Sequence, residues 1–263
     1  MALEFKSKPS LVAYITCGDP TLDVSREVAL TAIGAGAHVI ELGVPFSDPV
    51  ADGPVIQRAS ERALHQRVTL QHVLDLGRDL RRRSQAGLIV FSYLNPILQF
   101  GLQRFSDVTA EYGIDGALVT DLPVEEAGDY LRIMHSRKLA TVFLAAPTSP
   151  DQRLRRIVDG SSGFVYAVSR TGVTGERQQL ADDARTLVSR LRRATKLPIA
   201  VGFGISTPEQ FAAVGEFADG VVVGSAIVHT IEQNRGREAQ AVGDFVANLV
   251  RRPATARRTA SRG

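Results

Sequence analysis

Short runs of apolar residues recur along the chain, and each is followed by a polar segment with helical periodicity. Most of the runs are continuous rather than alternating, which is typical of parallel strands covered on both faces. The predicted strands are residues 11–16, 39–42, 88–93, 116–120, 141–145, 164–168, 199–201 and 221–223.

Helix signals fall between the strands. A stretch opening at Thr21 ends near Gly36, and a second starts at Thr69, places leucine and valine on one face and closes with Arg81–Arg83. The segment after Pro123 carries two acids in its first turn and closes at Arg137 and Lys138, as favoured by the helix dipole. Further predicted starts are Pro150-Asp151, Thr207-Pro208-Glu209 and Ser225.

Eight strands alternating with helices in about 250 residues predict an α/β fold, the single-domain (β/α)8 TIM barrel. A doubly wound open sheet is the competing fold at this length. The barrel is favoured because no GxGxxG follows the first strand and the glycine-rich turns come late. No Pro/Ser-rich linker interrupts the chain, so we expect a catalytic barrel over residues 1–250 and a disordered, Arg-rich tail over residues 251–263.

Composition narrows the environment and the partners. The single cysteine, Cys17, forms no internal disulfide, so we expect a reducing, cytoplasmic location. No apolar run reaches the roughly 18 residues that span a bilayer, and the first 19 residues are interpreted as leading into a strand, not as a signal peptide. The net charge of +3 is misleading, because the tail holds five arginines and leaves −2 on residues 1–250. A basic tail can contact nucleic acid, but this one has no aromatics for stacking and a disordered, solvating end is favoured, so neither a nucleic-acid nor a membrane partner is expected.

One acidic residue lies near the end of the second predicted strand and another follows it, and a barrel has its active site at the carboxyl ends of its strands. Glu41 lies late in an otherwise apolar strand, where partial desolvation would raise its pKa and suit it to proton transfer near neutral pH. An ion pair with a neighbouring cation is the alternative. Asp52 follows in a proline-punctuated loop, where an aspartate before glycine is more often a simple turn residue.

Three glycine-rich stretches follow the last three strands. They are Gly172–Gly175, Gly202–Ser206 and Gly224-Ser225. Glycine allows backbone N–H groups to approach an anion, and Ser225 would begin a helix whose positive end faces it. The pattern favours a phosphate site over turns that are merely tight.

Several residue types are missing from the predicted active-site end. No lysine follows a strand there, which argues against a Schiff-base aldolase, and the five histidines show no metal-ligand spacing. Cys17 has no basic neighbour and is interpreted as a plain buried thiol. What remains is acid–base chemistry on a small phosphorylated molecule, without metal or cofactor.

Five segments resemble the signature blocks of tryptophan synthase α subunits. They are Gly18-Asp19-Pro20, Glu41–Pro54 (ELGVPFSDPVADGP), Asp121-Leu122-Pro123, Ser169–Gly175 and Gly202–Ser206. The resemblance covers residues 10–250 in the family's order and leaves the tail outside. Cys17, where the family often has alanine, and Thr171 depart from the pattern without touching the proposed proton-transfer groups.

The resemblance implies retro-aldol cleavage of indole-3-glycerol phosphate to indole and D-glyceraldehyde 3-phosphate, in L-tryptophan biosynthesis. Glu41 matches the family's general acid/base, and Asp52 matches the acid that accepts the indole N–H. Further matches are pocket or lid residues (Phe91, Tyr93, Tyr166, Thr174) and phosphate-binding residues (Gly175, Gly204, Gly224, Ser225). Ordinary packing is an equal alternative for Phe91 and Tyr93.

A partner also follows from the resemblance. Family members pair with a pyridoxal-phosphate β subunit in an α2β2 complex, so that cofactor is expected on the partner only. Pro45, Phe46, Asp48 and Pro49 would lie on the contact side, although roofing of the active site explains them equally well. Two other functions stay open at this point: a binding subunit that mainly activates its partner, and another phosphate-binding barrel such as a sugar-phosphate isomerase or epimerase.

Overall fold

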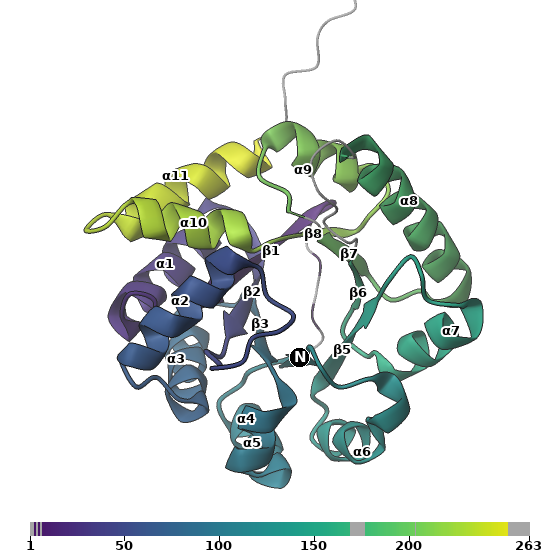
Figure 1. Cartoon of the computed structure of the whole chain (residues 1–263), viewed down its shortest axis with the longest axis horizontal. Helices are drawn as coiled ribbons and strands as arrows, with labels where there is room; N and C mark the ends of the chain where they lie inside the picture. Colours follow the sequence, from purple (N-terminus) through teal and green to yellow (C-terminus); the bar gives the residue numbers. More distant parts are fainter. Residues whose placement is uncertain (1–2, 4, 6, 169–176, 203, 252–263) are drawn as a thin grey trace, which may run out of the picture.

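The computed structural model describes residues 3, 5, 7–168, 177–202 and 204–251. Within these ranges eight parallel strands close into a barrel in sequence order, and each strand pairs with the next, the last returning to the first (Figure 1). The predicted TIM barrel is confirmed. The strands are β1 (Ser10–Thr16), β2 (Ala37–Gly43), β3 (Gly87–Ser92), β4 (Gly116–Val119), β5 (Ala140–Ala145), β6 (Val165–Val168), β7 (Ile199–Gly202) and β8 (Gly220–Val223).

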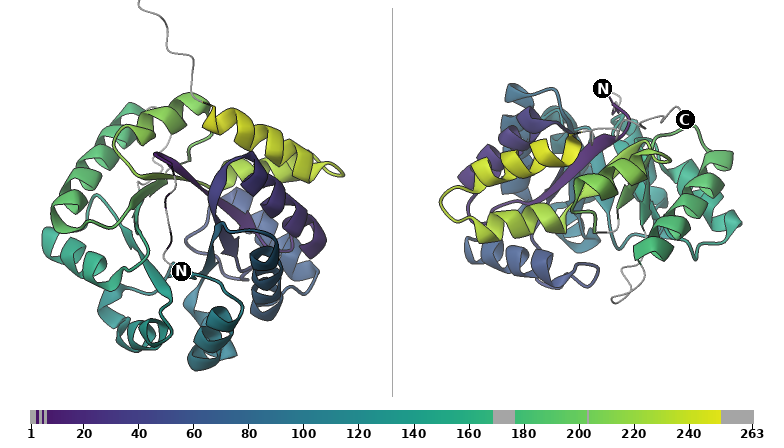
Figure 2. Two further views of the ribbon diagram at one scale, coloured as in Figure 1. Left: turned by 180° about the vertical axis from the view of Figure 1, so that it is seen from behind. Right: turned by 90° about the horizontal axis from the view of Figure 1, so that it is seen from above.

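Helices surround the sheet in every view, and α10 and α11 lie side by side (Figure 2). None of the helices in the described ranges is both long and apolar enough to cross a membrane. The helices are α1 (Leu22–Ala35), α2 (Pro54–His65), α3 (Leu70–Arg83), α4 (Leu94–Phe100), α5 (Leu102–Glu111), the 3₁₀ turn η1 (Val124–Glu126), α6 (Gly128–Ser136), α7 (Asp151–Gly160), α8 (Arg177–Ala194), α9 (Pro208–Gly215), α10 (Ser225–Gln233) and α11 (Glu238–Val250).

Most helix starts lie where the sequence predicts them, and their caps explain why. The Thr21 hydroxyl accepts the Val24 N–H at the start of α1, while Thr207 and Gln210 form a capping box at α9. The helix predicted after Pro123 is divided. The acid pair lies in η1 and α6 restarts at Gly128, a residue type with poor helix propensity.

Side chains alternate between the two faces of the sheet, and this alternation separates two cores. Outward-facing residues such as Leu11, Ala13 and Ile15 pack under the helices. Inward-facing residues fill the barrel with one belt of apolar side chains: Val12, Val39, Ile89, Leu118, Val142, Phe164, Ala200 and Val222. Leu3 and Phe5 pack against this belt, with the Phe5 and Phe164 rings 5.5 Å apart.

The next inward position along each strand lies two residues beyond the belt, toward the carboxyl ends. On β1, β2, β3 and β6 that position is Tyr14, Glu41, Phe91 and Tyr166. The mouth of the barrel is therefore lined by polar and aromatic side chains that lie directly above the apolar belt. The tail, residues 252–263, lies outside the described residues.

Candidate active site

Glu41 is a buried acid without a partner. Its side chain stands beside Tyr14 on β1 and Ile89 on β3 in the strand register and is 1% exposed. Neither carboxylate oxygen has a hydrogen-bond partner within the described ranges. The ion-pair interpretation is therefore wrong for this part of the chain. Burial raises the pKa of Glu41 to about 8, and a group titrating there both gives and takes a proton near neutral pH.

Two tyrosines line the mouth with Glu41. The Tyr14 ring packs edge-on against Phe91 at 5.0 Å, and its hydroxyl lies 3.3 Å from the Thr16 hydroxyl. Burial raises the pKa of Tyr14, with further contributions from Asp52 and Glu41, and burial followed by Glu41 raises that of Tyr166. Both hydroxyls thus stay protonated and are potential donors.

Glycines at the mouth leave room for these hydroxyls. A Cβ at Gly43 would lie 2.4 Å from the Tyr14 hydroxyl oxygen, and one at Gly202 would lie 2.6 Å from that of Tyr166. Tyr14 was not among the sequence candidates. Its signal was position alone: a tyrosine two residues after Val12 in a buried strand shares the inward face.

Asp52 is held by its loop and by β3. Its N–H bonds to the Pro49 carbonyl, so it does occupy a turn, but its carboxylate accepts a hydrogen bond from the Tyr93 hydroxyl at 3.1 Å. That hydroxyl in turn accepts the Ala51 N–H at 2.9 Å. Burial raises the pKa of Asp52 to about 6, against the lowering effect of the Tyr93 bond. The carboxylate is thus mostly ionised at neutral pH.

Aromatic rings extend this wall. The Phe46 ring lies 5.0 Å from that of Tyr93, in a tilted stack. Tyr93 is 3% exposed and Phe91 is half-buried against Tyr14. The alternative of ordinary packing thus holds in part, because both rings pack tightly, yet Tyr93 also positions a carboxylate.

The predicted anion site is only partly within the described residues. Thr174 and Gly175 lie outside them. Gly204 has a positive φ of +77° after β7, a conformation that favours glycine. Ser225 is the first residue of α10, which begins directly after Gly224, and a Cβ at Gly224 would approach Tyr14 Cβ to 3.4 Å. The amino terminus of α10 thus opens beside the mouth tyrosine, where its unpaired N–H groups favour an anion.

Cys17 follows the first strand at the same end of the barrel. It is fully buried, and burial raises the pKa of its thiol well above the usual range. A neutral thiol is a poor nucleophile. The structure supports the interpretation of Cys17 as a packing residue.

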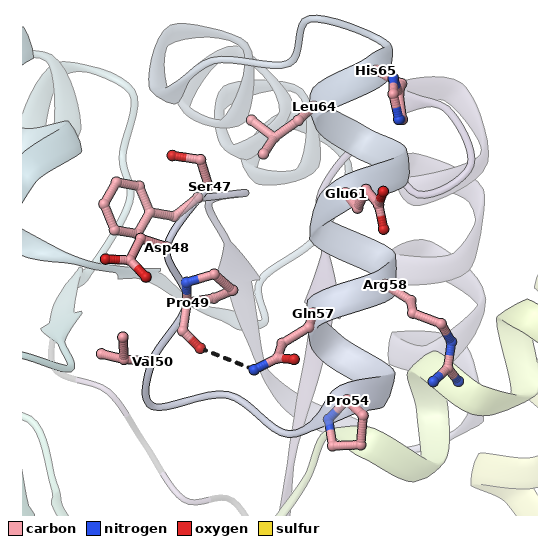
Figure 3. Close-up of a pocket in the computed structure, with 11 residues that line it drawn as sticks. Ser47, Asp48, Pro49, Val50, Pro54, Gln57, Arg58, Glu61, Leu64 and His65 are labelled. Atoms are coloured by element: carbon pink, nitrogen blue, oxygen red, sulfur yellow. Dashed lines mark hydrogen bonds between the residues drawn. The ribbon is translucent and has the colours of Figure 1, made fainter.

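A cavity of about 750 Å³ lies between the loop after β2 and helix α2 (Figure 3). Phe46, Asp48, Pro49 and Val50 line it from the loop, and its lining includes neither Glu41 nor Asp52. Val50 is 76% exposed. The apolar residues of this loop are joined in the lining by polar and charged residues, among them Asp48, Arg58 and Glu61, and the proton-transfer groups do not line the cavity.

A closed (β/α)8 barrel, whose mouth holds a buried acid that has no hydrogen-bond partner in the described ranges, is the arrangement found in TIM-barrel enzymes. The family model for the tryptophan synthase alpha chain matches residues 1–256. The chain belongs to the tryptophan synthase alpha chain family, whose members are lyases.

Individual relatives agree with the family model. The tryptophan synthase alpha chain of Solibacter usitatus is 52% identical over 232 residues, covering 88% of this chain and 87% of the relative. The crystal structure of tryptophan synthase subunit alpha from Legionella pneumophila is similar with a TM-score of 0.84 at 37% identity, covering 92% and 91% of the two chains. A chain of the tryptophan synthase complex from Pyrococcus furiosus gives a TM-score of 0.82 at 37% identity, covering 91% and 97%.

Proposed function

We propose that the chain cleaves indole-3-glycerol phosphate to indole and D-glyceraldehyde 3-phosphate, the α reaction of L-tryptophan biosynthesis. The observation that carries the proposal is the buried Glu41 carboxyl, which has no structural partner within the described ranges and titrates near pH 8. An unpaired buried acid costs free energy, and such groups concentrate at functional sites. Membership of the family supplies the substrate.

Glu41 alone carries out both proton transfers of the proposed reaction, and it ends the cycle in the protonated form in which it began. Protonated Glu41 gives its proton to indole C3, which turns the ring into an electron sink. The resulting Glu41 carboxylate then takes the proton of the glycerol hydroxyl next to the breaking bond. As the C–C bond breaks, its electron pair returns to the ring, an aldehyde forms, and Glu41 is again protonated. A pKa near 8 keeps both forms accessible throughout.

Asp52 acts on the other end of the indole. Its carboxylate would accept the indole N–H and stabilise the positive charge that develops when C3 is protonated. The Tyr93 hydroxyl, 3.1 Å from the carboxylate, fixes its direction. Phe91 and Tyr166 would complete the pocket around the ring, together with Thr174, which lies outside the described residues and matches a lid residue of the family.

The phosphate would be held by backbone groups rather than by cations. Gly204, Gly224 and Ser225, with Gly175, would form the site, and the unpaired N–H groups at the start of α10 would contribute to it. Strand β8, which leads into α10, pairs with one edge of β1. Strand β2, which carries Glu41, pairs with the opposite edge of β1. A substrate anchored there by its phosphate can extend across Tyr14 toward Glu41.

The proposed mechanism uses neither metal nor imine. In the described ranges no three His, Cys, Asp or Glu side chains are grouped to hold a metal ion. The four lysines precede strands, and Lys8 pairs with Asp219 at the opposite end of the barrel. Pyridoxal phosphate would be bound by the partner subunit alone.

We propose that the partner is a tryptophan synthase β subunit in an α2β2 complex. The structural neighbour from Pyrococcus furiosus was solved as a tryptophan synthase complex. The cavity-lining Phe46, Pro49 and exposed Val50 provide an apolar, stiffened contact surface next to the site.

Incubation of the purified chain with indole-3-glycerol phosphate tests the proposal. We expect free indole and glyceraldehyde 3-phosphate in equal amounts, unaffected by EDTA or borohydride and faster when β subunit is added. A chain that releases no indole alone or with β subunit contradicts the lyase proposal. No indole in either case, together with faster turnover of the β subunit when the chain is added, would favour the activating-subunit alternative.

Replacing Tyr93 tests how Asp52 is held. Tyr93→Phe removes the bond that favours ionised Asp52, so the pKa of Asp52 should rise above about 6, by up to about one unit. Because ionised Asp52 is required, activity is lost as pH falls through this pKa, and the acid limb of kcat/KM should move to higher pH. Tyr112→Phe, which keeps its stacking under Arg78, is the matched control. An acid limb that stays in place in Tyr93→Phe would argue against the contact.

A further inference from the structure

Asp19, in the Gly18-Asp19-Pro20 motif, has no role in the proposed chemistry. It follows β1 at the active-site end and is 1% exposed. Two hydrogen bonds from Arg62 of α2 satisfy its carboxylate: Nε to Oδ1 and a terminal nitrogen to Oδ2, both at 2.8 Å. Such a fork fixes orientation as well as distance.

The Arg62 guanidinium also contacts a third element, helix α10. Its other terminal nitrogen donates to Glu232 of α10 at 2.9 Å. Glu232 also accepts a fork from Arg58, one helical turn before Arg62, at 2.8 and 2.9 Å. Figure 3 shows Arg58 extending from α2 toward the neighbouring helix. Hydrogen bonds from Arg58 are the largest cause that lowers the pKa of Glu232 to about 2, so Glu232 stays ionised at neutral pH.

The clamp, defined as Asp19, Arg58, Arg62 and Glu232, joins the elements that carry the two ends of the proposed site. Helix α2 begins two residues after Asp52, and the Gln57 side-chain amide donates a hydrogen bond of 2.9 Å to the Asp52 carbonyl. Helix α10 begins at Ser225. At 1.5 Å per residue, Arg62 and Glu232 lie about 12 Å and about 10 Å from these helix starts, at matching depth.

A slip of one helix along the other would change the separation of the two subsites. Ala59 and Val228 pack between the helices beside Tyr14, but small apolar contacts alone do not fix axial position. The clamp supplies directional hydrogen bonds, and these fix the position of one helix along the axis of the other. We propose that Arg62 is a positioning residue that sets the distance between the phosphate subsite and the Asp52 subsite, and so matches the site to the length of the substrate. This inference rests on the proposed function.

The test separates one-ended from two-ended ligands. Calorimetry would measure the binding of indole, of glycerol 3-phosphate and of the non-cleavable 3-(indol-3-yl)propyl phosphate. In Arg62→Gln we expect the affinity for the two-ended probe to fall at least tenfold, while each one-ended probe changes less than twofold. KM for indole-3-glycerol phosphate should rise more than kcat falls. Arg137→Gln, which breaks an exposed pair between the residue after α6 and Asp107 of α5, away from the site, should change nothing.

Glu232→Gln is the second variant, because Arg62→Gln leaves the buried Asp19 with only the longer ion pair to Arg235 at 3.6 Å and can fail to fold. It retains the Asp19–Arg62 fork and should show the same pattern more weakly. Equal loss of affinity for all three probes, or two-ended binding within twofold of wild type in every folded variant, overturns the inference. The proposed function fails separately, if wild-type protein releases no indole.

Discussion

Glu41→Gln is expected to reduce indole formation by about a thousandfold or more, because general acid–base catalysis contributes about 10²–10⁴ and here one carboxyl performs both transfers. Glutamine has nearly the same shape but neither gives up a proton to C3 nor accepts one from the hydroxyl. The variant should therefore bind 3-(indol-3-yl)propyl phosphate within a few-fold of wild type. Steady-state indole release and calorimetric binding, measured on the same preparations, check the two halves of this expectation.

Glu111→Gln is the matched control for that experiment. Glu111 ends helix α5, is exposed, and lies away from the mouth of the barrel. Its replacement should leave kcat and KM unchanged. A Glu41→Gln protein that retains more than a tenth of wild-type activity would remove Glu41 from the proposed mechanism.

The same substitution should increase stability at alkaline pH. The pKa of Glu41 is about 8 in the folded protein against 4.5 unfolded. Below pH 4.5 both states carry the proton, and between pH 4.5 and 8 the unfolded state loses it first. Wild-type stability therefore falls across this window, and a shift of this size corresponds to about 5 kcal/mol. The glutamine of the Glu41→Gln variant does not titrate, so the variant does not lose this part of the free energy of unfolding.

Denaturant unfolding of both proteins at pH 5 and pH 9 measures the effect. The free energy of unfolding of the variant minus that of wild type should increase by about 3–5 kcal/mol from pH 5 to pH 9. Other titrating groups are common to both proteins and cancel in the difference. A difference that is the same at both pH values would mean that Glu41 has an ordinary pKa.

The eight strands were predictable from sequence to within one or two residues because strands buried on both faces are continuous apolar runs. Helices were harder. The predicted starts carried caps such as Thr21 and Thr69, whereas α2 begins after Gly53 without a side-chain cap. Helix α5 likewise follows Gly101 with no capping side chain. Where the signal for a helix is packing alone, sequence reasoning has little to detect.

In the site, too, some features were predictable from the sequence and others were not. Position on a strand was enough to place Glu41 at the mouth, because the inward face repeats every two residues. The absence of a partner for its carboxylate within the described ranges, and the contact of Tyr93 with Asp52, depend on how loops fold back. The clamp joins Asp19 to Arg62 and Arg62 to Glu232, 170 residues further along the chain. Such pairs cannot be predicted from the spacing of residues in the sequence.

Direct titration of the Glu41 carboxyl tests the central claim. The infrared difference spectrum between wild-type protein and Glu41→Gln isolates this one group, and its protonated and ionised bands can be followed from pH 4 to pH 10. We expect the protonated band to disappear with a midpoint near pH 8. A midpoint near 4.5 would show a hydrated or paired carboxylate and would contradict the account.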